Sequence, residues 1–302
     1  MNQPNPFKKA ERTQIPLKIA LTGPSGSVKT MGACFVAQGM AEAEGGRVAL
    51  IDTENKSASL YSDRFDFDTI QLDPPYTIDK YTAAIDAAVA NGYKVLVIDS
   101  ISHAWSGEGG LLQKKEQLDS RGGKQNQYAN WAPITKEQET FMAKILHSDI
   151  HIICTIRSKQ DYALVEKNGK KEVEKLGLAP VQRDGVEYEF TVVFDGAMDH
   201  TVKASKDRTG IFKDRIFVIT KDLGKELITW LKSAKPVDPP KKEIEKTRGV
   251  IDDALYEIDH AETIDALRGV IEKINTCTWT DEEKSHIASK KEARKLALKE
   301  VA

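Results

Sequence analysis

The sequence predicts an α/β protein, with a core built on a mostly parallel sheet flanked by helices and a small helical module at the C-terminus. Two observations support this. Short runs that are apolar on both faces alternate with helical patterns through the first half of the 302 residues, as expected for strands covered on both sides of a sheet. Further on, three prolines at positions 236, 239 and 240 precede three amphipathic helix patterns.

The first half of the chain contains four expected strands and three expected helices. The strands are expected at residues 17–22, 47–52, 94–99 and 150–156, and the helices at residues 31–44, 77–90 and 133–147. Gly45-Gly46 and Asn91-Gly92 end the first two helices, because glycine and asparagine tolerate the left-handed conformation found there. Strands that alternate with helices in this way predict parallel pairing.

The pattern changes after Ile156. A β-hairpin is expected at residues 162–174, because both residues of the Asn168-Gly169 turn tolerate positive φ. Strands at residues 190–194, 201–204 and 215–220 are expected to extend the sheet in antiparallel fashion, and a helix at residues 222–232 to close the core.

Three domains follow from these elements: a core at residues 1–232, a proline-rich linker at 233–243 and a helical module at 244–302. The prolines cannot continue a helix and favour an extended spacer. In the module, Thr280 and Glu283 form a capping-box pattern before the third helix.

Charge and cysteine usage restrict the class of protein. Lys+Arg is 44 and Asp+Glu is 46, so the net charge of −2 excludes binding to nucleic acid or membrane by bulk charge alone but leaves room for a local basic surface. Three widely spaced cysteines predict neither a disulfide framework nor a zinc site, which favours a reducing cytoplasm. No apolar run approaches the roughly 18 residues of a membrane span, so no membrane contact is expected.

A phosphate-binding loop is the strongest motif. It follows the first strand, opens a helix and consists of Gly23, Pro24, Ser25, Gly26, Ser27, Val28, Lys29 and Thr30. This nearly matches G-x-x-x-x-G-K-[ST], in which backbone N–H groups hold phosphates, Lys29 neutralises them and the Thr30 hydroxyl ligates Mg²⁺. ATP and Mg²⁺ are therefore the expected cofactors.

One position departs from the motif: Val28 stands where the last glycine is expected. A β-branched side chain there could crowd the phosphates or resist the backbone angles of the loop, which would lower hydrolysis. The alternative interpretation of the whole segment is a Gly/Ser-rich turn that binds nothing.

Two carboxylates at strand ends complete the expected chemistry. Asp99 ends the strand at 94–99 and would hold the water shell of Mg²⁺. Glu54, just after the strand at 47–52, would orient the attacking water. Alternatively, Asp99 is only an acid at the point where a strand meets a turn. Glu54 is alternatively a helix-capping or solvent-exposed acid.

These motifs resemble a known family. Ile51-Asp52-Thr53-Glu54 looks like the strand end that carries the catalytic glutamate in RecA-like strand-exchange ATPases, and Asp99-Ser100-Ile101 is similar to their sequence. Over residues 15–230 the chain resembles phage-encoded RecA-fold AAA-type ATPases, including single-strand annealing and recombination proteins. The resemblance implies a RecA-like P-loop NTPase core, hydrolysis of ATP, single-stranded DNA as a partner and the cytoplasm of a bacterial host.

The same resemblance suggests further roles. Thr155 and Arg157, at the end of the fourth strand, would sense the γ-phosphate. Lys206 and Arg208 resemble the K-x-R-x-G turn that reaches the ATP of the next subunit, which implies a homo-oligomer, a ring or a filament. Without the resemblance, Arg157 is equally well a surface residue and the Lys206 turn a solvated basic turn.

Two basic segments are candidates for contact with single-stranded DNA. Residues 107–131 and 157–183 are expected to be mobile loops in which basic residues mix with aromatic ones, a combination that suits phosphate neutralisation and base stacking. The candidate DNA-binding residues are Lys114, Lys115, Arg121, Lys124, Lys170 and Lys171. Acids interleave with them, so solvated faces are the alternative.

The sequence thus favours an ATPase that acts on single-stranded DNA in recombination or strand annealing, with a single-strand-binding protein as a candidate partner. Two alternatives stay open. One is a nucleotide-gated assembly protein with weak hydrolysis, and the other is a helicase or loader-type DNA motor.

Overall fold

The computed structural model describes residues 7, 9–122, 127–167, 170–236 and 250–300. The chain divides into two compact units, Met1–Pro236 and Val237–Ala302. The strands are β1 (Lys18–Gly23), β2 (Val48–Asp52), β3 (Asp68–Gln71), β4 (Val95–Asp99), β5 (His151–Lys167), β6 (Lys170–Pro180), β7 (Val192–Gly196), β8 (Thr201–Asp207) and β9 (Ile216–Val218). The helices of the first unit are α1 (Lys29–Glu44), α2 (Ile78–Ala90), α3 (Ser102–Ser106), α4 (Leu111–Gly122), α5 (Trp131–His147) and α6 (Lys221–Lys232).

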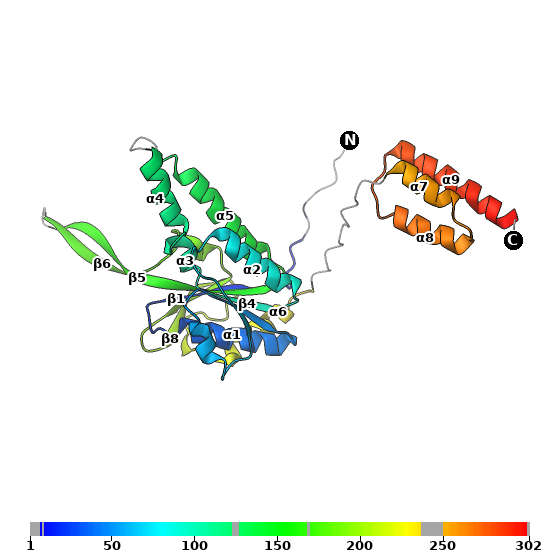
Figure 1. Ribbon diagram of the computed structural model, residues 1–302. Helices are drawn as coiled ribbons and strands as arrows, with labels where there is room; N and C mark the ends of the chain where they lie inside the picture. The colour runs from blue at the N-terminus through cyan, green and yellow to red at the C-terminus, as the bar shows by residue number, and fades with distance from the viewer. Residues whose placement is uncertain (1–6, 8, 123–126, 168–169, 237–249, 301–302) are drawn as a thin grey trace. The chain divides into compact units, whose positions relative to one another are not determined.

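The first unit is built on one sheet with helices on both faces (Figure 1). The strand order is β3-β2-β4-β5-β1-β7-β8-β9, and β6 pairs with β5 outside this path. From β3 to β7 the neighbouring strands run parallel, whereas the pairs β7–β8 and β8–β9 are antiparallel. The predicted α/β fold, a mostly parallel sheet flanked by helices, is confirmed.

Each face of the sheet has its own hydrophobic core. On one face α1 and α6 cover the strands through residues such as Val36, Met40 and Leu227. On the other face α2 and α5 contribute Tyr81 and Phe141, whose rings lie 5.2 Å apart. Strands that are apolar on both sides therefore become buried on both sides. This packing on both faces holds in place the carboxyl ends of the strands, where the polar residues lie.

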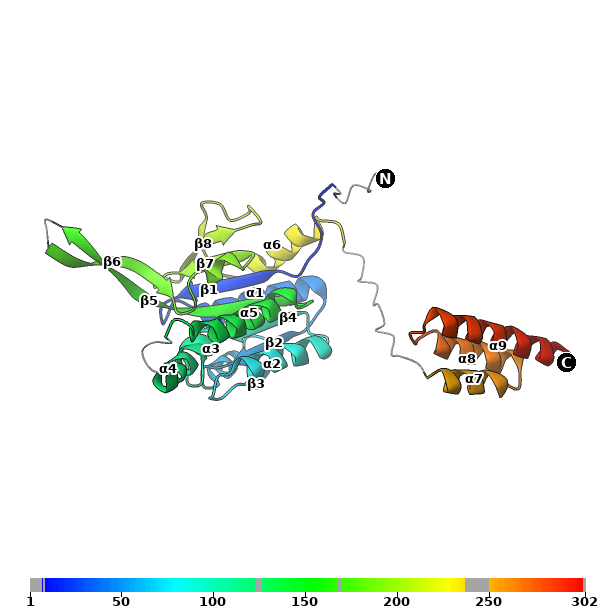
Figure 2. The same ribbon diagram turned by 90° about the horizontal axis from the view of Figure 1, so that it is seen from above.

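Strand β5 is longer than the sequence pattern indicates. Residues Ile152–Arg157 pair in parallel with β1, and residues 158–167 then leave the sheet and pair with β6 in antiparallel register. The hairpin extends beyond the sheet at the carboxyl end of the parallel strands (Figure 2). The predicted turn, Asn168-Gly169, lies outside the described residues, and for 160–177 the structure describes the backbone alone.

Three local expectations are corrected. Residues 107–131 are not one loop, because Leu111–Gly122 form α4, which packs Leu111 and Leu118 on the core at a seven-residue spacing. The strand near 190–194 is β7, and it runs parallel to β1 because residues 181–191 carry the chain from Arg157 of β5, whose carbonyl oxygen accepts the Val181 N–H, back to the start of β1, where the Thr191 N–H donates to the carbonyl oxygen of Lys18. Strand β3 was not expected, since its short sequence DTIQ is mostly exposed and shows no apolar run.

In the second unit, residues 250–300 form the helices α7 (Ile251–Asp259), α8 (Ile264–Ile274) and α9 (Asp281–Glu300). They pack through a small core that includes Ile258, Leu267 and Ile287. The predicted capping box is present: the Thr280 N–H donates to Glu283 Oε2 at 2.7 Å, and the Glu283 N–H donates to Thr280 Oγ1 at 3.3 Å. Most of the predicted linker, from residue 237 onward, lies outside the described residues.

Candidate functional site

The loop at Gly23–Val28 joins the buried strand β1 to α1, as the motif predicts. A Cβ atom at Gly23 would lie 2.3 Å from Ser27 Oγ and 2.9 Å from the carbonyl oxygen of Gly196, so only glycine fits this close approach. The loop ends at the N-terminus of α1, where backbone N–H groups lack carbonyl partners within the helix and where the helix dipole favours an anion.

Val28 adopts the conformation that a glycine would have. Its φ is 65° and its ψ is 23°, which is the left-handed region, and it is the N-cap residue of α1. A β-branched residue rarely adopts these angles, at a cost of about 1–2 kcal/mol. Val28 therefore carries backbone strain at the position where the motif has glycine.

The two residues after Val28 point their polar groups at the loop and at β4. Lys29 Nζ donates to the carbonyl oxygen of Pro24 at 2.7 Å, and Thr30 Oγ1 donates to Asp99 Oδ2 at 2.6 Å. Burial lowers the pKa of Lys29, and the negative charges of Asp99 and Glu54 partly offset this effect. The Lys29 amine therefore lies against the loop, and it is the one positively charged group in residues 23–30 that could neutralise phosphate oxygens.

Asp99 is the buried centre of the site, with 2% of its surface exposed. Its second oxygen, Oδ1, accepts a hydrogen bond from Thr155 Oγ1 at the neighbouring position of β5. Burial raises the pKa of Asp99, and the hydrogen bonds from the two threonines counteract this only in part. The predicted sensor Thr155 therefore contacts the predicted Mg²⁺-binding acid directly.

Glu54 is placed by the residue at the end of β2. Asp52 Oδ1 accepts the N–H of Glu54 at 2.6 Å and Oδ2 accepts the N–H of Ala58 at 2.9 Å, so the buried Asp52 carboxylate fixes the turn that carries Glu54. The register of β2 and β4 sets Asp52 beside Asp99. Two strand ends thereby bring Glu54 to the same cleft as the loop.

Arg157 binds Glu54 through two nitrogen atoms. Nε donates to Glu54 Oε1 at 2.8 Å and Nη2 donates to Oε2, while Ser100 Oγ donates to Oε1 at 3.3 Å. Burial alone would raise the pKa of Glu54, but the hydrogen bonds and charge of Arg157 outweigh it, so the pKa of Glu54 lies below its usual value. The predicted sensor arginine and the predicted catalytic acid form one ion pair.

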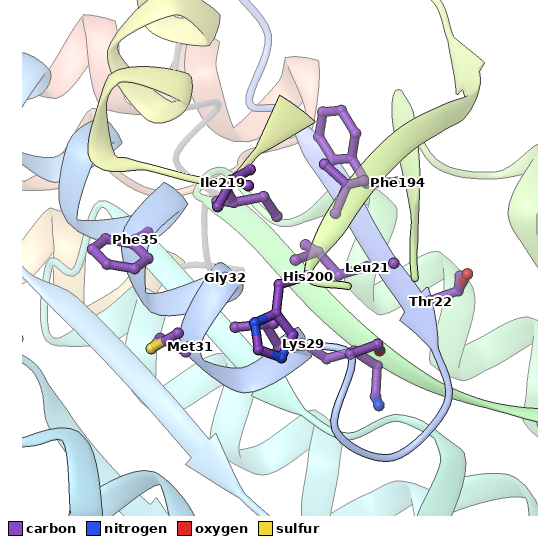
Figure 3. A pocket seen from close by; sticks show the side chains of 14 residues that line it. Leu21, Thr22, Lys29, Met31, Gly32, Phe35, Phe194, His200 and Ile219 are labelled. Carbon is purple, nitrogen blue, oxygen red and sulfur yellow. The ribbon is translucent and has the colours of Figure 1, made fainter. Parts of the chain in front are cut away.

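These groups line a single open cleft of about 670 Å³. The lining includes Ser25, Gly26, Val28, Lys29, Thr30, Glu54, Asp99 and Arg157. An adjoining apolar pocket of about 90 Å³ shares Val28, Lys29, Met31 and His200 with the cleft. Figure 3 shows that Leu21, Phe194 and Ile219 also line this pocket. The polar cleft, and not the apolar pocket, has the charges that a triphosphate requires.

The cleft fits a magnesium nucleotide. Thr30 and Asp99 present a hydroxyl and a carboxylate oxygen to the same point, and these hard oxygen ligands are the type that Mg²⁺ prefers. Within the described residues no group of three or more His, Cys, Asp or Glu could hold a metal on its own. A cation here would depend on phosphate oxygens for its remaining ligands, as Mg²⁺ usually does.

Lys206 and Arg208 lie away from this cleft. Both donate to the carbonyl oxygen of Tyr188, Arg208 through Nη2 at 3.0 Å, and Lys206 Nζ also donates to the carbonyl of Glu187 at 3.1 Å. Neither residue lines the cleft of its own chain. Lys206 lies on β8 and Arg208 just after it, and three strands (β5, β1 and β7) separate β8 from β4. The structure therefore groups these two residues with each other and not with Lys29 or Glu54.

The candidate DNA-binding lysines of α4 are already paired. Lys114 contacts Glu137, and Lys115 contacts Asp119 and lies 5.2 Å from the centre of the Trp131 ring. Arg121 is exposed near the end of α4, and Lys124 lies outside the described residues. Lys170 and Lys171 are the first two residues of β6, and for them the structure describes only the backbone.

Sequence reasoning missed several residues around Glu54. Thr53 Oγ1 accepts the N–H of Ser100 at 2.8 Å and lies 2.7 Å from His103 Nδ1. His103 stacks on Tyr76, and burial and the charge of Arg157 lower its pKa. Thr53 and Ser100 lie within the two segments that carry the family resemblance, but His103 and Tyr76 match no motif and lie far apart in sequence, so no sequence signal pointed to them.

Comparisons with known proteins identify a family model and a solved structure that are similar to this chain. Residues 15–222 match the family model described as an AAA domain. Among solved structures, a KaiC-like protein from the hyperthermophilic archaeon Pyrococcus horikoshii OT3 is similar, with 19% identity and a TM-score of 0.41 over 70% of this chain and 94% of that chain. No curated protein matches the sequence. Among the described helices, none is long and apolar enough to cross a membrane.

Proposed function

This chain belongs to the AAA domain family, and from that premise we propose that it hydrolyses Mg-ATP and couples hydrolysis to a grip on single-stranded DNA in recombination or strand annealing. One observation carries the proposal: the cleft that holds Lys29, Thr30 and Asp99 also holds Glu54. The first three suit binding of a magnesium triphosphate, and the fourth suits activation of water.

The residues divide the work of hydrolysis as follows. Lys29 leaves the Pro24 carbonyl to neutralise phosphate oxygens, and Thr30 with Asp99 would hold Mg²⁺, which supplies positive charge to the phosphates when bound. Glu54 accepts a hydrogen bond from water and directs its lone pair at the γ-phosphorus. Orientation is the main task, because phosphoryl transfer needs little covalent help from protein.

The DNA part of the proposal is supported by position. The β5–β6 hairpin and α4 both follow strands whose carboxyl ends carry the cleft, β5 and β4. Filter binding with a labelled oligo-dT and ATPase rates with and without it provide the test. We expect salt-sensitive binding and faster hydrolysis with DNA. If oligo-dT neither binds nor accelerates hydrolysis, the proposed action on DNA is wrong and the proposed hydrolysis of ATP still stands.

We further propose that Lys206 and Arg208 act on the cleft of a neighbouring subunit in a homo-oligomer. Their distance from their own cleft supports this, since a finger residue must face outward to reach another site. Mixing two inactive variants tests it. Subunits with Lys29→Ala keep Lys206 and Arg208 intact, and subunits with Arg208→Ala keep an intact cleft. A mixture of the two is expected to regain part of the hydrolysis. No recovery in a mixed oligomer would contradict a role in trans.

A second function is favoured by the left-handed Val28: a nucleotide-gated assembly protein that binds ATP and hydrolyses it slowly. The rate of phosphate release by the wild type and by Val28→Gly separates the two. A large gain with glycine supports the gated protein, and equal rates support the ATPase. A DNA motor is distinguished by unwinding of a duplex with a single-stranded tail.

A further inference from the structure

Thr53 is held at each of its polar atoms. It is buried, with 1% of its surface exposed. Its N–H donates to the carbonyl oxygen of Asp99 at 2.7 Å. Its hydroxyl oxygen accepts the N–H of Ser100 at 2.8 Å and lies 2.7 Å from His103 Nδ1. Its carbonyl oxygen accepts a hydrogen bond from the phenol of Tyr76 at 3.3 Å. All three polar groups of Thr53 are therefore fixed in direction.

The peptide bond that joins Thr53 to Glu54 is held on both sides. Its carbonyl oxygen accepts the hydrogen bond from Tyr76, and its N–H donates to Asp52 Oδ1 at 2.6 Å. Because a peptide unit is planar, these two hydrogen bonds set its orientation, and with it the direction in which the Cα of Glu54 presents its side chain. Buried contacts therefore set the base of the Glu54 side chain, whereas Arg157 binds the carboxylate at its other end.

His103 and Tyr76 support each other. Their rings are stacked, with centroids 4.8 Å apart and planes 15° from parallel. Gly107 packs against both residues: a Cβ atom there would lie 2.8 Å from Tyr76 Cδ2 and 2.6 Å from the carbonyl oxygen of His103, so only glycine fits at this contact. Each ring reaches a different polar atom of Thr53. The two stacked rings of His103 and Tyr76 thus form a clamp on Thr53, which we call the ring clamp.

Both rings have the protonation state that these hydrogen bonds require. Burial raises the pKa of Tyr76, so its phenol stays protonated and can donate. Burial and the charge of Arg157 lower the pKa of His103, so its ring is neutral at pH 7. A neutral imidazole forms one hydrogen bond with the Thr53 hydroxyl in either tautomer, as the acceptor or as the donor. The ring clamp therefore adds no charge beside Glu54.

We propose that His103 and Tyr76 are positioning residues, which hold Glu54 in the orientation from which it directs water at the γ-phosphorus. The inference rests on the proposed function, in which Glu54 orients the attacking water. Neither ring lines the cleft, so both act through Thr53 and not on the substrate. Their loss should lower kcat and leave nucleotide binding unchanged, because the phosphate-binding loop is intact. A purely structural pair of rings would change stability and leave kcat of the folded protein unchanged.

The test measures kcat and nucleotide affinity separately, without DNA. Tyr76→Phe removes one oxygen and keeps the stacked ring, and His103→Leu removes the ring nitrogens and keeps an apolar side chain. We expect kcat to fall about tenfold in each, since a misplacement of about 1 Å can slow a reaction by about 100-fold. Affinity for a fluorescent ATP analogue should stay within about twofold of the wild type. His103→Asn places an amide near the position of Nδ1, so it should recover most of the rate.

The second unit supplies a matched control. Tyr256 and His260 are a second stacked pair of the same two residue types, with ring centroids 3.9 Å apart, and both are exposed. Tyr256→Phe and His260→Leu should hydrolyse ATP at the rate of the wild type. Thermal unfolding shows which variants are folded at the assay temperature. If His103→Leu does not fold, Tyr76→Phe, which loses a single oxygen atom, decides the test.

Combination with Glu54→Gln shows whether the ring clamp acts through the acid. In that background Tyr76→Phe should have no further effect on the residual rate, because the group that it positions has already lost its function. A further tenfold loss would mean that Tyr76 acts elsewhere, and the proposal would be wrong.

The remaining outcomes separate the ring clamp from the function on which it rests. If the wild type hydrolyses ATP and the folded variants Tyr76→Phe and His103→Leu match its kcat, the ring clamp is wrong and the hydrolase stands. A fall in kcat that is accompanied by an equal loss of affinity, or that His103→Asn does not relieve, also overturns it. If the wild type binds the ATP analogue but does not hydrolyse ATP, the hydrolase and the ring clamp are both wrong and nucleotide binding stands.

Discussion

The nucleotide cleft and helix α4 follow strands of the same sheet, but they hold their charged groups in different ways. In the cleft, contacts join residues that are distant in sequence, such as Thr30 with Asp99 and Glu54 with Arg157, and Asp99 is buried. On α4, Lys115 pairs with Asp119 one turn away and Lys114 pairs with the adjacent helix α5 at the surface. Exposed ion pairs such as Lys114–Glu137 contribute little, and Lys115–Asp119 is satisfied within its own helix, whereas buried polar groups that converge across strands are typical of functional sites.

The largest effect is expected from Asp99→Asn, which tests the buried centre of the cleft. Hydrolysis should fall by about 100-fold or more, because the amide cannot supply the negative charge that holds Mg²⁺. Phosphate release at saturating Mg-ATP measures this. Hydrolysis close to that of the wild type would show that Asp99 is only a structural acid.

Without metal, Asp99→Asn is expected to be more stable to unfolding than the wild type at high pH, although it hydrolyses ATP more slowly. Burial raises the pKa of Asp99 in the folded protein, so the folded state favours the protonated form. That stabilisation is present at low pH, and it is lost as the pH rises through the raised pKa. The loss begins above the ordinary pKa of an aspartate, about 4, so thermal unfolding in EDTA followed from that pH upward should show a fall of Tm in the wild type that Asp99→Asn lacks.

Lys29→Ala tests the binding half of the cleft. Affinity for Mg-ATP should fall by about 10- to 150-fold, as expected when a charged hydrogen-bond donor to phosphate is removed. Titration with a fluorescent ATP analogue measures the change, with Lys136→Ala on the exposed side of α5 as a control. Equal affinities for Lys29→Ala and the wild type would mean that the loop does not bind phosphate.

Val28→Gly tests whether the left-handed conformation of Val28 strains the phosphate-binding loop. Glycine accepts the left-handed angles without steric cost, so the free energy of unfolding should increase by about 1 kcal/mol after the greater flexibility of unfolded glycine is included. Urea unfolding measures it. A decrease would show that the valine side chain contributes more through packing than it costs in backbone strain.

The smallest effects are expected from the candidate DNA-binding lysines. Replacing both Lys170 and Lys171 by alanine should weaken oligo-dT binding modestly and reduce the salt dependence by about 0.7 per lysine. Lys115→Ala should leave the salt slope unchanged, because that amine is already held by Asp119 and Trp131. If Lys115→Ala changes the slope most, α4 and not the hairpin is the DNA-binding element.

The sequence predicted the cleft better than its surroundings. Parallel strands alternate with helices and end in polar residues, so Glu54, Asp99 and Thr155 had to meet at one edge of the sheet. The contact between Glu54 and Arg157 could not be predicted, since it depends on where β5 leaves the sheet. Periodicity also missed α4, because Leu111 and Leu118 lie among lysines and glutamines that are equally typical of a loop.

The central claim is that Glu54 activates water in a cleft that binds Mg-ATP, and Glu54→Gln tests it most directly. The amide keeps the size of the side chain and removes its charge. Phosphate release is measured at saturating Mg-ATP together with affinity for the nucleotide. The account predicts nucleotide affinity within about twofold of the wild type and hydrolysis slower by about 100-fold or more. Equal rates of hydrolysis in Glu54→Gln and the wild type would contradict it.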